Sequence, residues 1–367
     1  MTSNLQPFPQ NVIAVIWDFD KTLIPGYMQK PLFEHFNVDE NSFWNEVNRL
    51  PAFYKEHGHP LFPTDIGYLS HVLTYVQEGI FGGLSNKLLL ELGAKLQFFQ
   101  GLPDFFDVLK RRIEAEPRFK QRDIKLEHYV VSTGLSQMIR GSAIHEHVDG
   151  VWGCELLGVT APPHFKLKPE VTPTPDPDAP LTSIAYAIDN TTKTRAIFEI
   201  NKGVNRHPQI DVNSLMPHEA RRVPFDHMIY IADGPSDVPV FSVVKQYGGK
   251  TFAVYAPESQ TPKDFRQAEE LQNQGRVHAF GPADYRRGTH TYLCITTWAE
   301  QIAEKIAKRW QTALGDTLGT VPTHILPAEG EIAQAEAEPV EGLADGSANM
   351  ESERDGLENT DDGSVSV

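Results

Sequence analysis

Two aspartates separated by one residue follow an apolar segment near the beginning of the chain. The segment 12–17 reads VIAVIW, and Asp18 and Asp20 come directly after it. Carboxylates held this close resist joint ionisation, so a divalent cation or a shared proton must relieve their repulsion. Asp233 and Asp237, far along the chain, could add carboxylate oxygens, the ligands that Mg²⁺ prefers. The four aspartates therefore predict a magnesium site if the fold brings them together.

Strands of a parallel sheet must position these aspartates. Segments 12–17, 128–132 and 228–232 are continuous apolar runs, which is typical of strands buried on both faces. Each run ends in small or acidic residues, and ligands of open α/β sheets bind beyond the carboxyl ends of the strands. A pair of aspartates in this spacing also occurs by chance in turns and helix caps. The apolar strand before Asp18 and the threonine at position 22 favour the interpretation as a site.

The remaining segments indicate an α/β fold with an insertion. Apolar residues in 25–98 recur at helical spacing and predict a small inserted helical domain. Further strands are predicted at 183–188, 251–255 and 292–296, and helices at 104–114 and 298–310. Seven prolines in 162–180 predict a loop. The expected architecture is a Rossmann-like parallel sheet with helices on both faces and an all-helical insertion.

The charge of the chain is unevenly distributed. The 367 residues include 33 Lys and Arg and 49 Asp and Glu, which gives a formal charge of −16. Residues 327–367 carry −11 of this and few aromatic residues, so a disordered acidic tail is expected there. The acidity argues against nucleic acid or anionic lipid as the main partner.

The compartment follows from cysteine usage and hydropathy. The chain has two cysteines and no apolar run of about 18 residues, so we expect a cytoplasmic protein without a membrane span. The oligomeric state is left open by the sequence.

Four segments in order resemble the motifs of the haloacid dehalogenase-like (HAD) superfamily. VIAVIWDFDKTL is similar to the first motif, and 130–134 is similar to the second. Lys193, in a D-x-x-x-K context before a predicted helix, resembles the third motif, and 229–237 resembles the fourth. The resemblance covers about 13–260 and supports the same α/β core.

The resemblance implies roles for the acidic residues. Asp18 would be the nucleophile that forms an aspartyl-phosphate, and Asp20 would be the general acid and then the base that activates water. Mg²⁺ would be bound by Asp18, the backbone carbonyl of Asp20 and Asp233, while Asp237 would complete the outer shell.

The resemblance also implies donors for the phosphoryl oxygens. Phosphoryl transfer depends mainly on positioning and on neutralisation of charge. The Ser132 hydroxyl, the amides of Thr133 and Gly134 at an expected helix start, and the Lys193 ammonium would serve as phosphate-binding groups.

Among the activities of the superfamily, the acid at position 20 favours hydrolysis of phosphate esters over cleavage of carbon–halogen or carbon–phosphorus bonds. The expected function is a Mg²⁺-dependent phosphatase acting on a small phosphorylated metabolite. A phosphotransferase or phosphomutase with the same intermediate is the enzymatic alternative. A protein that binds a phosphorylated ligand without catalysis is a third interpretation.

The helical insertion resembles the cap of the phosphoserine phosphatase-like branch. The expected domains are a core from 11–24 and 99–326, a cap from 25–98 and the tail from 327–367. In that branch an acidic residue shortly after the first motif meets the substrate ammonium. Here the segment 24–30 reads IPGYMQK and contains no carboxylate, so phosphoserine is not expected to be the preferred substrate.

Overall fold

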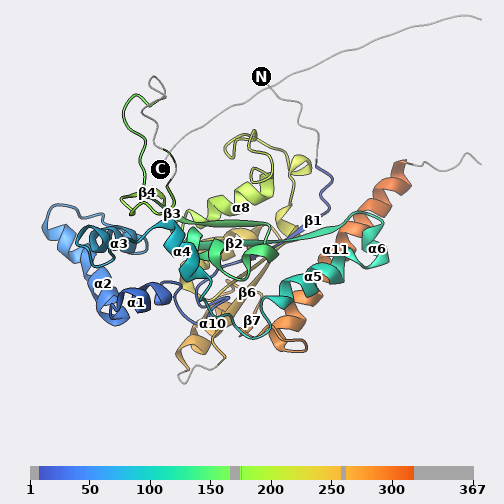
Figure 1. The fold of residues 1–367 in the computed structure, drawn as a ribbon. Helices are drawn as coiled ribbons and strands as arrows, with labels where there is room; N and C mark the ends of the chain where they lie inside the picture. Colours follow the sequence, from blue (N-terminus) through green and yellow to red (C-terminus); the bar gives the residue numbers. More distant parts are fainter. Residues whose placement is uncertain (1–7, 166–173, 175, 258–261, 318–367) are drawn as a thin grey trace, which may run out of the picture. The chain divides into compact units, whose positions relative to one another are not determined.

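Seven strands form one sheet at the centre of the structure (Figure 1). The structure is a computed structural model that describes residues 8–165, 174, 176–257 and 262–317. The strands are β1 (Val12–Trp17), β2 (Lys125–Leu135), β3 (Gly150–Leu157), β4 (Ser183–Tyr186), β5 (Met228–Ala232), β6 (Lys250–Tyr255) and β7 (Ala279–Pro282). Their order is β4-β3-β2-β1-β5-β6-β7, and every neighbouring pair is parallel except β3 and β4. The predicted Rossmann-like α/β class is confirmed.

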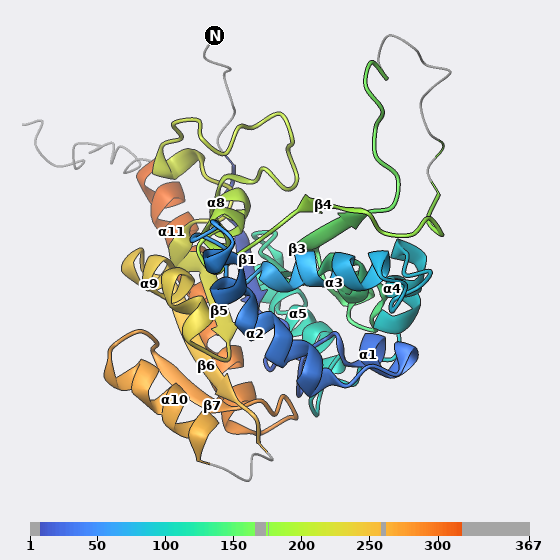
Figure 2. The same ribbon diagram turned by 90° about the vertical axis from the view of Figure 1, so that its left-hand side faces the viewer.

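Helices cover both faces of this sheet (Figures 1 and 2). Helices α5 and α11 pack on one face, and α8 and α9 pack on the other. The helices are α1 (Lys30–Phe36), α2 (Glu40–Glu56), α3 (Gly67–Gln77), α4 (Asn86–Gly93), α5 (Asp104–Glu114), α6 (Pro117–Lys120), α7 (Ser136–Gly141), α8 (Lys193–Lys202), α9 (Val238–Gln246), α10 (Lys263–Asn273) and α11 (His290–Thr317).

The first strand lies in the middle of the sheet although it comes first in the chain. All six residues of β1 are buried. Val15 is paired with His128 of β2 on one side and with Ile229 of β5 on the other. Since these three strands are parallel, the residues that follow them meet at the same edge of the sheet.

Four helices, α1 to α4, form the insertion between β1 and α5, as the apolar spacing of 25–98 predicted. Asp39 caps α2 by accepting a hydrogen bond from the Ser42 amide, and Ser85 caps α4 by accepting one from the Leu88 amide. The buried side of the insertion is rich in aromatic rings; Phe33 and Phe43, for example, have centroids 4.9 Å apart. We retain 25–98 as the proposed extent of a cap.

Two glycines fix the insertion to the core. A Cβ atom at Gly93 of α4 would lie 2.1 Å from the Met138 carbonyl oxygen, and one at Gly141 of α7 would lie 2.0 Å from the Leu90 carbonyl oxygen. The backbones of α4 and α7 therefore approach so closely that a side chain fits at neither position. This contact holds the end of the insertion against the element that follows β2.

One predicted strand is wrong. Residues 292–296 belong to helix α11, which begins at His290 and includes the predicted helix 298–310. Tyr292, Ile295 and Ala299 are buried at helical spacing, so the short apolar run is the start of an amphipathic helix. The expected acidic tail, 327–367, lies outside the described residues. None of the helices in the part of the chain that the structure describes has the length and apolar character needed to cross a membrane.

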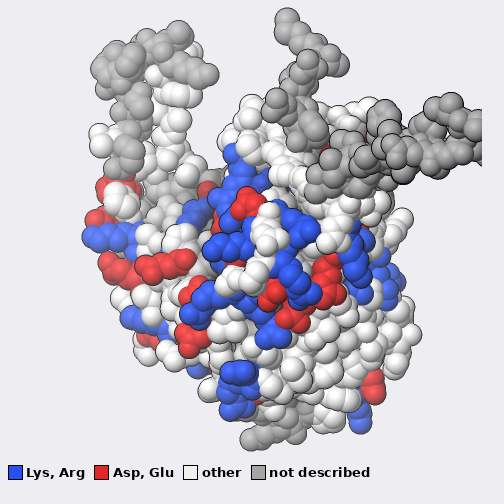
Figure 3. Space-filling view, turned by 90° about the vertical axis from the view of Figure 1, so that its right-hand side faces the viewer, with Lys and Arg blue, Asp and Glu red and all other residues white. Residues whose placement is uncertain are grey.

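Charged side chains of both signs gather on the face formed by α5, α6 and α11 (Figure 3). The Arg112 guanidinium lies 2.5 Å from a Glu300 carboxylate oxygen, and the Lys305 ammonium lies 2.6 Å from Asp226. Basic and acidic groups lie side by side in these pairs, so this face carries charges of both signs.

Candidate active site

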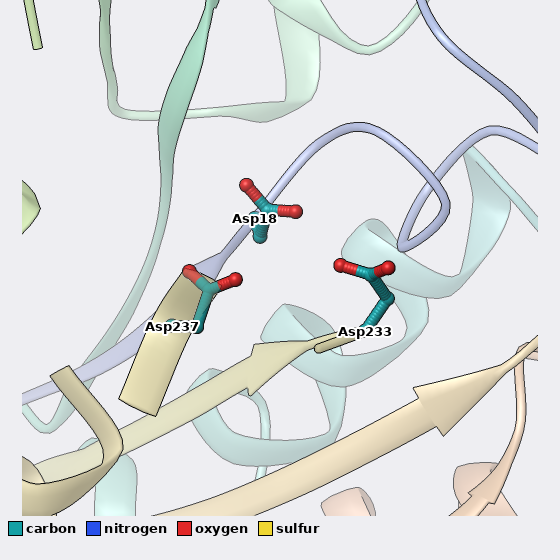
Figure 4. A group of neighbouring side chains, drawn as sticks. All are labelled: Asp18, Asp233 and Asp237. Atoms are coloured by element: carbon teal, nitrogen blue, oxygen red, sulfur yellow. The ribbon is translucent and has the colours of Figure 1, made fainter. Parts of the chain in front are cut away.

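Three carboxylates meet at the carboxyl ends of β1 and β5 (Figure 4). Asp18 follows β1, Asp233 follows β5, and Asp237 ends the short 3₁₀ turn Pro235–Asp237. One oxygen from each carboxylate lies within 4.8 Å of the others. The Asp18 amide donates a hydrogen bond of 2.9 Å to the Ile231 carbonyl, so the pairing of the two strands continues into the site. Three of the four aspartates expected at the strand ends therefore lie together, and their role as metal ligands stays a prediction.

Lys193 is the cation of this group and is 1% exposed. Its ammonium donates hydrogen bonds of 2.7 Å both to Asp18 Oδ1 and to Asp237 Oδ1. Burial alone would lower the pKa of Lys193, but the negative charges of Asp18 and Asp237 raise it above the usual range of a lysine. Lys193 is therefore a permanent positive charge between two carboxylates.

The loop before α8 places Lys193. The Asp189 carboxylate accepts hydrogen bonds from the amides of Thr191 and Thr192, at 2.9 and 2.6 Å. These bonds satisfy amide donors that would otherwise be unpaired at the beginning of the helix. Lys193 is the first residue of α8, so its side chain starts from a fixed point beside the ends of the strands.

The negative charge of the group exceeds what one lysine neutralises. Burial raises the pKa of Asp18 to about 6, although Lys193 opposes this shift. Burial, followed by the charges of Asp18 and Asp237, raises the pKa of Asp233 well above its usual range. The Asp233 carboxylate has no ion-pair partner among the described residues. Three oxygen ligands with an uncompensated charge fit a hard divalent cation such as Mg²⁺.

Asp20 stands apart from the three grouped carboxylates. Its Oδ1 accepts a hydrogen bond of 2.9 Å from the Met28 amide, and its side chain borders a cavity. Burial and then the charge of Asp18 raise the pKa of Asp20 to about 8. A carboxyl group that retains its proton near neutral pH is suited to act as a general acid.

The second motif has a different backbone from the one expected. Strand β2 continues through Leu135 and α7 begins at Ser136, so Thr133 and Gly134 lie in a strand and not at a helix start. The Gly134 amide donates a hydrogen bond of 3.0 Å to the Ser132 hydroxyl oxygen. A Cβ atom at position 134 would lie 2.1 Å from Cε of Met28, so a larger residue there would displace the end of the Met28 side chain. The roles of Ser132, Thr133 and Gly134 in binding phosphate stay predictions.

Tyr230 belongs to the site but was not predicted from the sequence. It is fully buried in β5, and its hydroxyl donates a hydrogen bond of 2.5 Å to Asp237 Oδ1. Ser236 donates to the other oxygen of Asp237 at 2.8 Å. In the sequence Tyr230 is one aromatic residue of an apolar strand, and no local pattern indicates its contact with Asp237.

A cavity of about 440 Å³ opens between Asp20 and the inserted helices. The core contributes Thr133 and Gly134 to it, and the remaining lining residues come from the first part of the insertion: Tyr27, Gln29, Glu40, Asn41, Trp44, Val47, Asn48, Thr64, Asp65 and Tyr68. The cavity is large enough for a small organic group next to Asp20.

Comparison with curated proteins finds a close relative. An uncharacterized protein of Borreliella burgdorferi is 39% identical over 289 residues, which cover 78% of this chain and 96% of that protein. No protein family model matches the chain.

Solved structures that share part of the fold have low sequence identity. A HAD family hydrolase from Salmonella enterica serovar Typhi is 13% identical, covers 75% of this chain and 68% of its own, and has a TM-score of 0.42. A probable phosphoserine phosphatase from Vibrio cholerae is 12% identical, with coverages of 82% and 69% and a TM-score of 0.41. A phospho-aspartyl intermediate analogue of phosphoserine phosphatase is 13% identical, with coverages of 75% and 93% and a TM-score of 0.39.

Proposed function

This chain has a HAD-like fold and belongs to the same family as the uncharacterized Borreliella burgdorferi protein, and from its site we propose that it is a Mg²⁺-dependent phosphomonoester hydrolase. The proposal rests on one observation. Asp18, Asp233 and Asp237 lie together, the buried Lys193 bonds Asp18 and Asp237, and Asp20, two residues after Asp18, lines the cavity. A nucleophile, charge-neutralising groups and a general acid are thus close together, as hydrolysis through a covalent intermediate requires.

In the proposed reaction a carboxylate oxygen of Asp18 attacks phosphorus and displaces the alkoxide of the substrate. Asp20 gives its proton to that alkoxide, which leaves as an alcohol. The Asp20 carboxylate then takes a proton from a water molecule, whose oxygen attacks phosphorus and releases Asp18 and inorganic phosphate. Lys193 offsets negative charge next to the transferred group throughout.

The grouped aspartates would hold the metal. Asp18 and Asp233 would bind Mg²⁺ together with the backbone carbonyl of Asp20, and Asp237 would support them. When bound, Mg²⁺ supplies charge neutralisation at the phosphoryl oxygens. The residues fit this role because the three carboxylates lie together and, within the described segments, Lys193 forms ion pairs with Asp18 and Asp237 but not with Asp233.

Hydrolysis of 4-nitrophenyl phosphate in the presence of Mg²⁺ tests the proposal. The wild type should release phosphate, EDTA should abolish the release, and Asp18→Asn should lower kcat on the order of 10³-fold or more. Asp104→Asn, on the exposed first turn of α5, is the matched control and should keep full activity. A wild type that hydrolyses no phosphomonoester, or a fully active Asp18→Asn, would refute the function.

A second assay distinguishes hydrolysis from transfer. Addition of an alcohol such as glycerol should leave the yield of inorganic phosphate almost unchanged if water is the acceptor. A stoichiometric conversion to the glycerol phosphate ester would instead identify a phosphotransferase.

A further inference from the structure

The cavity next to Asp20 differs in its chemistry from the phosphate site, and it indicates the class of leaving group. We propose that the substrate is an aminoalkyl phosphate, in which the alcohol carries an ammonium group and no carboxylate. The proposal rests on the phosphatase function given above and adds the identity of the alcohol to it. Three observations carry it: the charges on the wall, an unpartnered oxygen and a group of aromatic rings.

The charged groups on the cavity wall are all acidic. Besides Asp20, the lining includes the carboxylates of Glu40, at the first turn of α2, and Asp65, in the loop before α3. No lysine or arginine is among the lining residues. Lys30 is exposed, and its ammonium lies 4.0 Å from Glu34 on the neighbouring turn of α1. Lys21, which follows Asp20, is not a lining residue and donates a hydrogen bond of 3.1 Å to the Tyr27 hydroxyl. Among the lining residues, an anionic leaving group would therefore have no cationic partner.

An unpartnered acceptor adds to these charges. Gln29 is 2% exposed and lines the cavity, and its side-chain oxygen has no hydrogen-bond partner among the residues that the structure describes. A buried amide oxygen without a donor is costly, so a ligand that supplies N–H groups would be favoured. The indole N–H of Trp44 is also unpartnered and could donate to an ester or phosphate oxygen of the same ligand.

Aromatic rings complete a site suited to a cation. The Trp44 ring lies 5.2 Å from that of Tyr27 and 5.9 Å from that of Tyr68, and all three residues line the cavity. Aromatic faces attract ammonium groups, including quaternary ones. The ammonium of Lys21 lies 4.5 Å above the centre of the Tyr27 ring and occupies one face of it. The rings of Trp44 and Tyr68 are therefore the ones offered to an ammonium group of the substrate.

The same arrangement disfavours amino acid phosphates. The ammonium of phosphoserine would find partners in Glu40 and Asp65, but its carboxylate would be placed beside them without a cation. The sequence suggested that phosphoserine is not preferred because 24–30 lacks an acid. The structure argues against phosphoserine for a different reason. Carboxylates from later parts of the insertion do reach the cavity, and they would repel the carboxylate of phosphoserine.

Steady-state kinetics with four substrates tests the proposal on the wild type. Phosphoethanolamine and phosphocholine represent primary and quaternary ammonium groups, propyl phosphate is the uncharged analogue, and phosphoserine adds the carboxylate. We expect kcat/KM for one or both amino substrates to exceed that for propyl phosphate and phosphoserine by about tenfold or more. Comparison of the two amines identifies which type of ammonium the site accepts.

Two matched variants distinguish the loss of a carboxylate inside the cavity from the loss of a carboxylate elsewhere on the insertion. Glu40→Gln should lower kcat/KM for the amino substrates and so remove most of their advantage over propyl phosphate. Glu34→Gln, an exposed residue outside the cavity lining, should retain the preference. Equal kcat/KM values for amino and propyl substrates in the wild type, or an unaltered preference in Glu40→Gln, would overturn the proposal.

Binding measurements keep the two proposals distinguishable. Asp18→Asn cannot form the covalent phosphate, so calorimetric titration of this variant reports binding alone. If nitrophenyl phosphate is hydrolysed but amino and propyl phosphates are turned over and bound equally, the substrate class is wrong and the phosphatase function stands. If nothing is hydrolysed but phosphoethanolamine or phosphocholine still binds about tenfold more tightly than propyl phosphate, the cavity assignment stands and the function is wrong.

Discussion

Lys193 donates a 2.7 Å hydrogen bond to Asp18 across a separation of 175 residues in the chain. The same ammonium bonds Asp237, so removal of the side chain leaves two buried carboxylates without their cation. We expect Lys193→Met to lower kcat for nitrophenyl phosphate by about 10³-fold and the free energy of unfolding by about 3–5 kcal/mol. Urea denaturation with and without Mg²⁺ measures the second effect, and Mg²⁺ should restore part of the loss.

The control for this prediction is Lys120→Met, an exposed lysine at the end of α6. Its activity and unfolding midpoint should match the wild type. A Lys193→Met protein with wild-type turnover would show that Lys193 has only a structural role.

Tyr230 orients Asp237 through a hydrogen bond from its hydroxyl group. Tyr230→Phe removes that donor and retains the ring, so it should weaken Mg²⁺ activation about 10-fold, seen as a higher Mg²⁺ concentration at half-maximal rate. The readout is the dependence of the rate on Mg²⁺ at saturating substrate.

Tyr129→Phe provides the comparison for Tyr230→Phe. Tyr129 is also a buried strand tyrosine whose hydroxyl donates to a carboxylate, but that carboxylate is Glu127, which is not part of the grouped aspartates. Loss of about 1–2 kcal/mol of stability is expected in both variants. Identical Mg²⁺ curves for the two variants would contradict a role of Tyr230 in the metal site.

Asp20 should matter more for poor leaving groups than for good ones. Asp20→Asn keeps the acceptor oxygen for the Met28 amide but cannot donate a proton to the alkoxide. Turnover of an alkyl phosphate should fall by about 10²–10⁴-fold. Nitrophenolate leaves without protonation, so the first turnover should persist as a rapid burst of nitrophenol before slow hydrolysis. Equal losses in the burst phase for both substrates would argue against general acid catalysis.

His128 makes the folded protein sensitive to acid. Trp17 Nε1 donates to His128 Nδ1 at 3.2 Å, and Nε2 lies 3.1 Å from the Phe106 carbonyl, an arrangement that requires a neutral ring. Burial lowers the pKa of His128 from 6.5 to about 3. Below pH 6.5 the unfolded chain therefore binds a proton at His128 that the folded chain does not bind. As the pH drops through this range, His128 lowers the free energy of unfolding by about 1.4 kcal/mol per pH unit.

Urea midpoints at pH 7.5 and pH 5 measure this loss. His128→Gln should be less stable at pH 7.5 but should lose less stability on acidification than the wild type. His35→Gln, at the exposed end of α1, should retain the wild-type pH dependence. An unchanged slope in His128→Gln would assign the acid sensitivity to other groups.

The sequence was sufficient to predict the site residues that are positioned by the strand or helix next to them in the chain. Asp18 and Asp233 each end an apolar strand, and parallel strands bring their ends to one edge of the sheet. Lys193 was predicted from its D-x-x-x-K context before a helix, and the structure places its ammonium on Asp18.

Features that depend on tertiary packing could not be predicted. The contact of Tyr230 with Asp237 requires the turn that reverses the chain between them. Glu40 and Asp65 reach the cavity only because α2 and the loop before α3 fold over the strand ends. Residues 292–296 form a short apolar run whose period fits either a strand or a helix, and packing against the sheet decided for the helix.

The central position of β1 has a consequence for synthesis of the protein on the ribosome. This apolar strand emerges first, but it pairs with β2 and with β5, which ends only at Ala232. Until then one edge of a fully apolar strand has no partner, a state prone to aggregation. A nascent chain that stops before β5 also lacks Asp233 and Asp237, so the apolar edge of β1 gains its partner only when the candidate site is being completed.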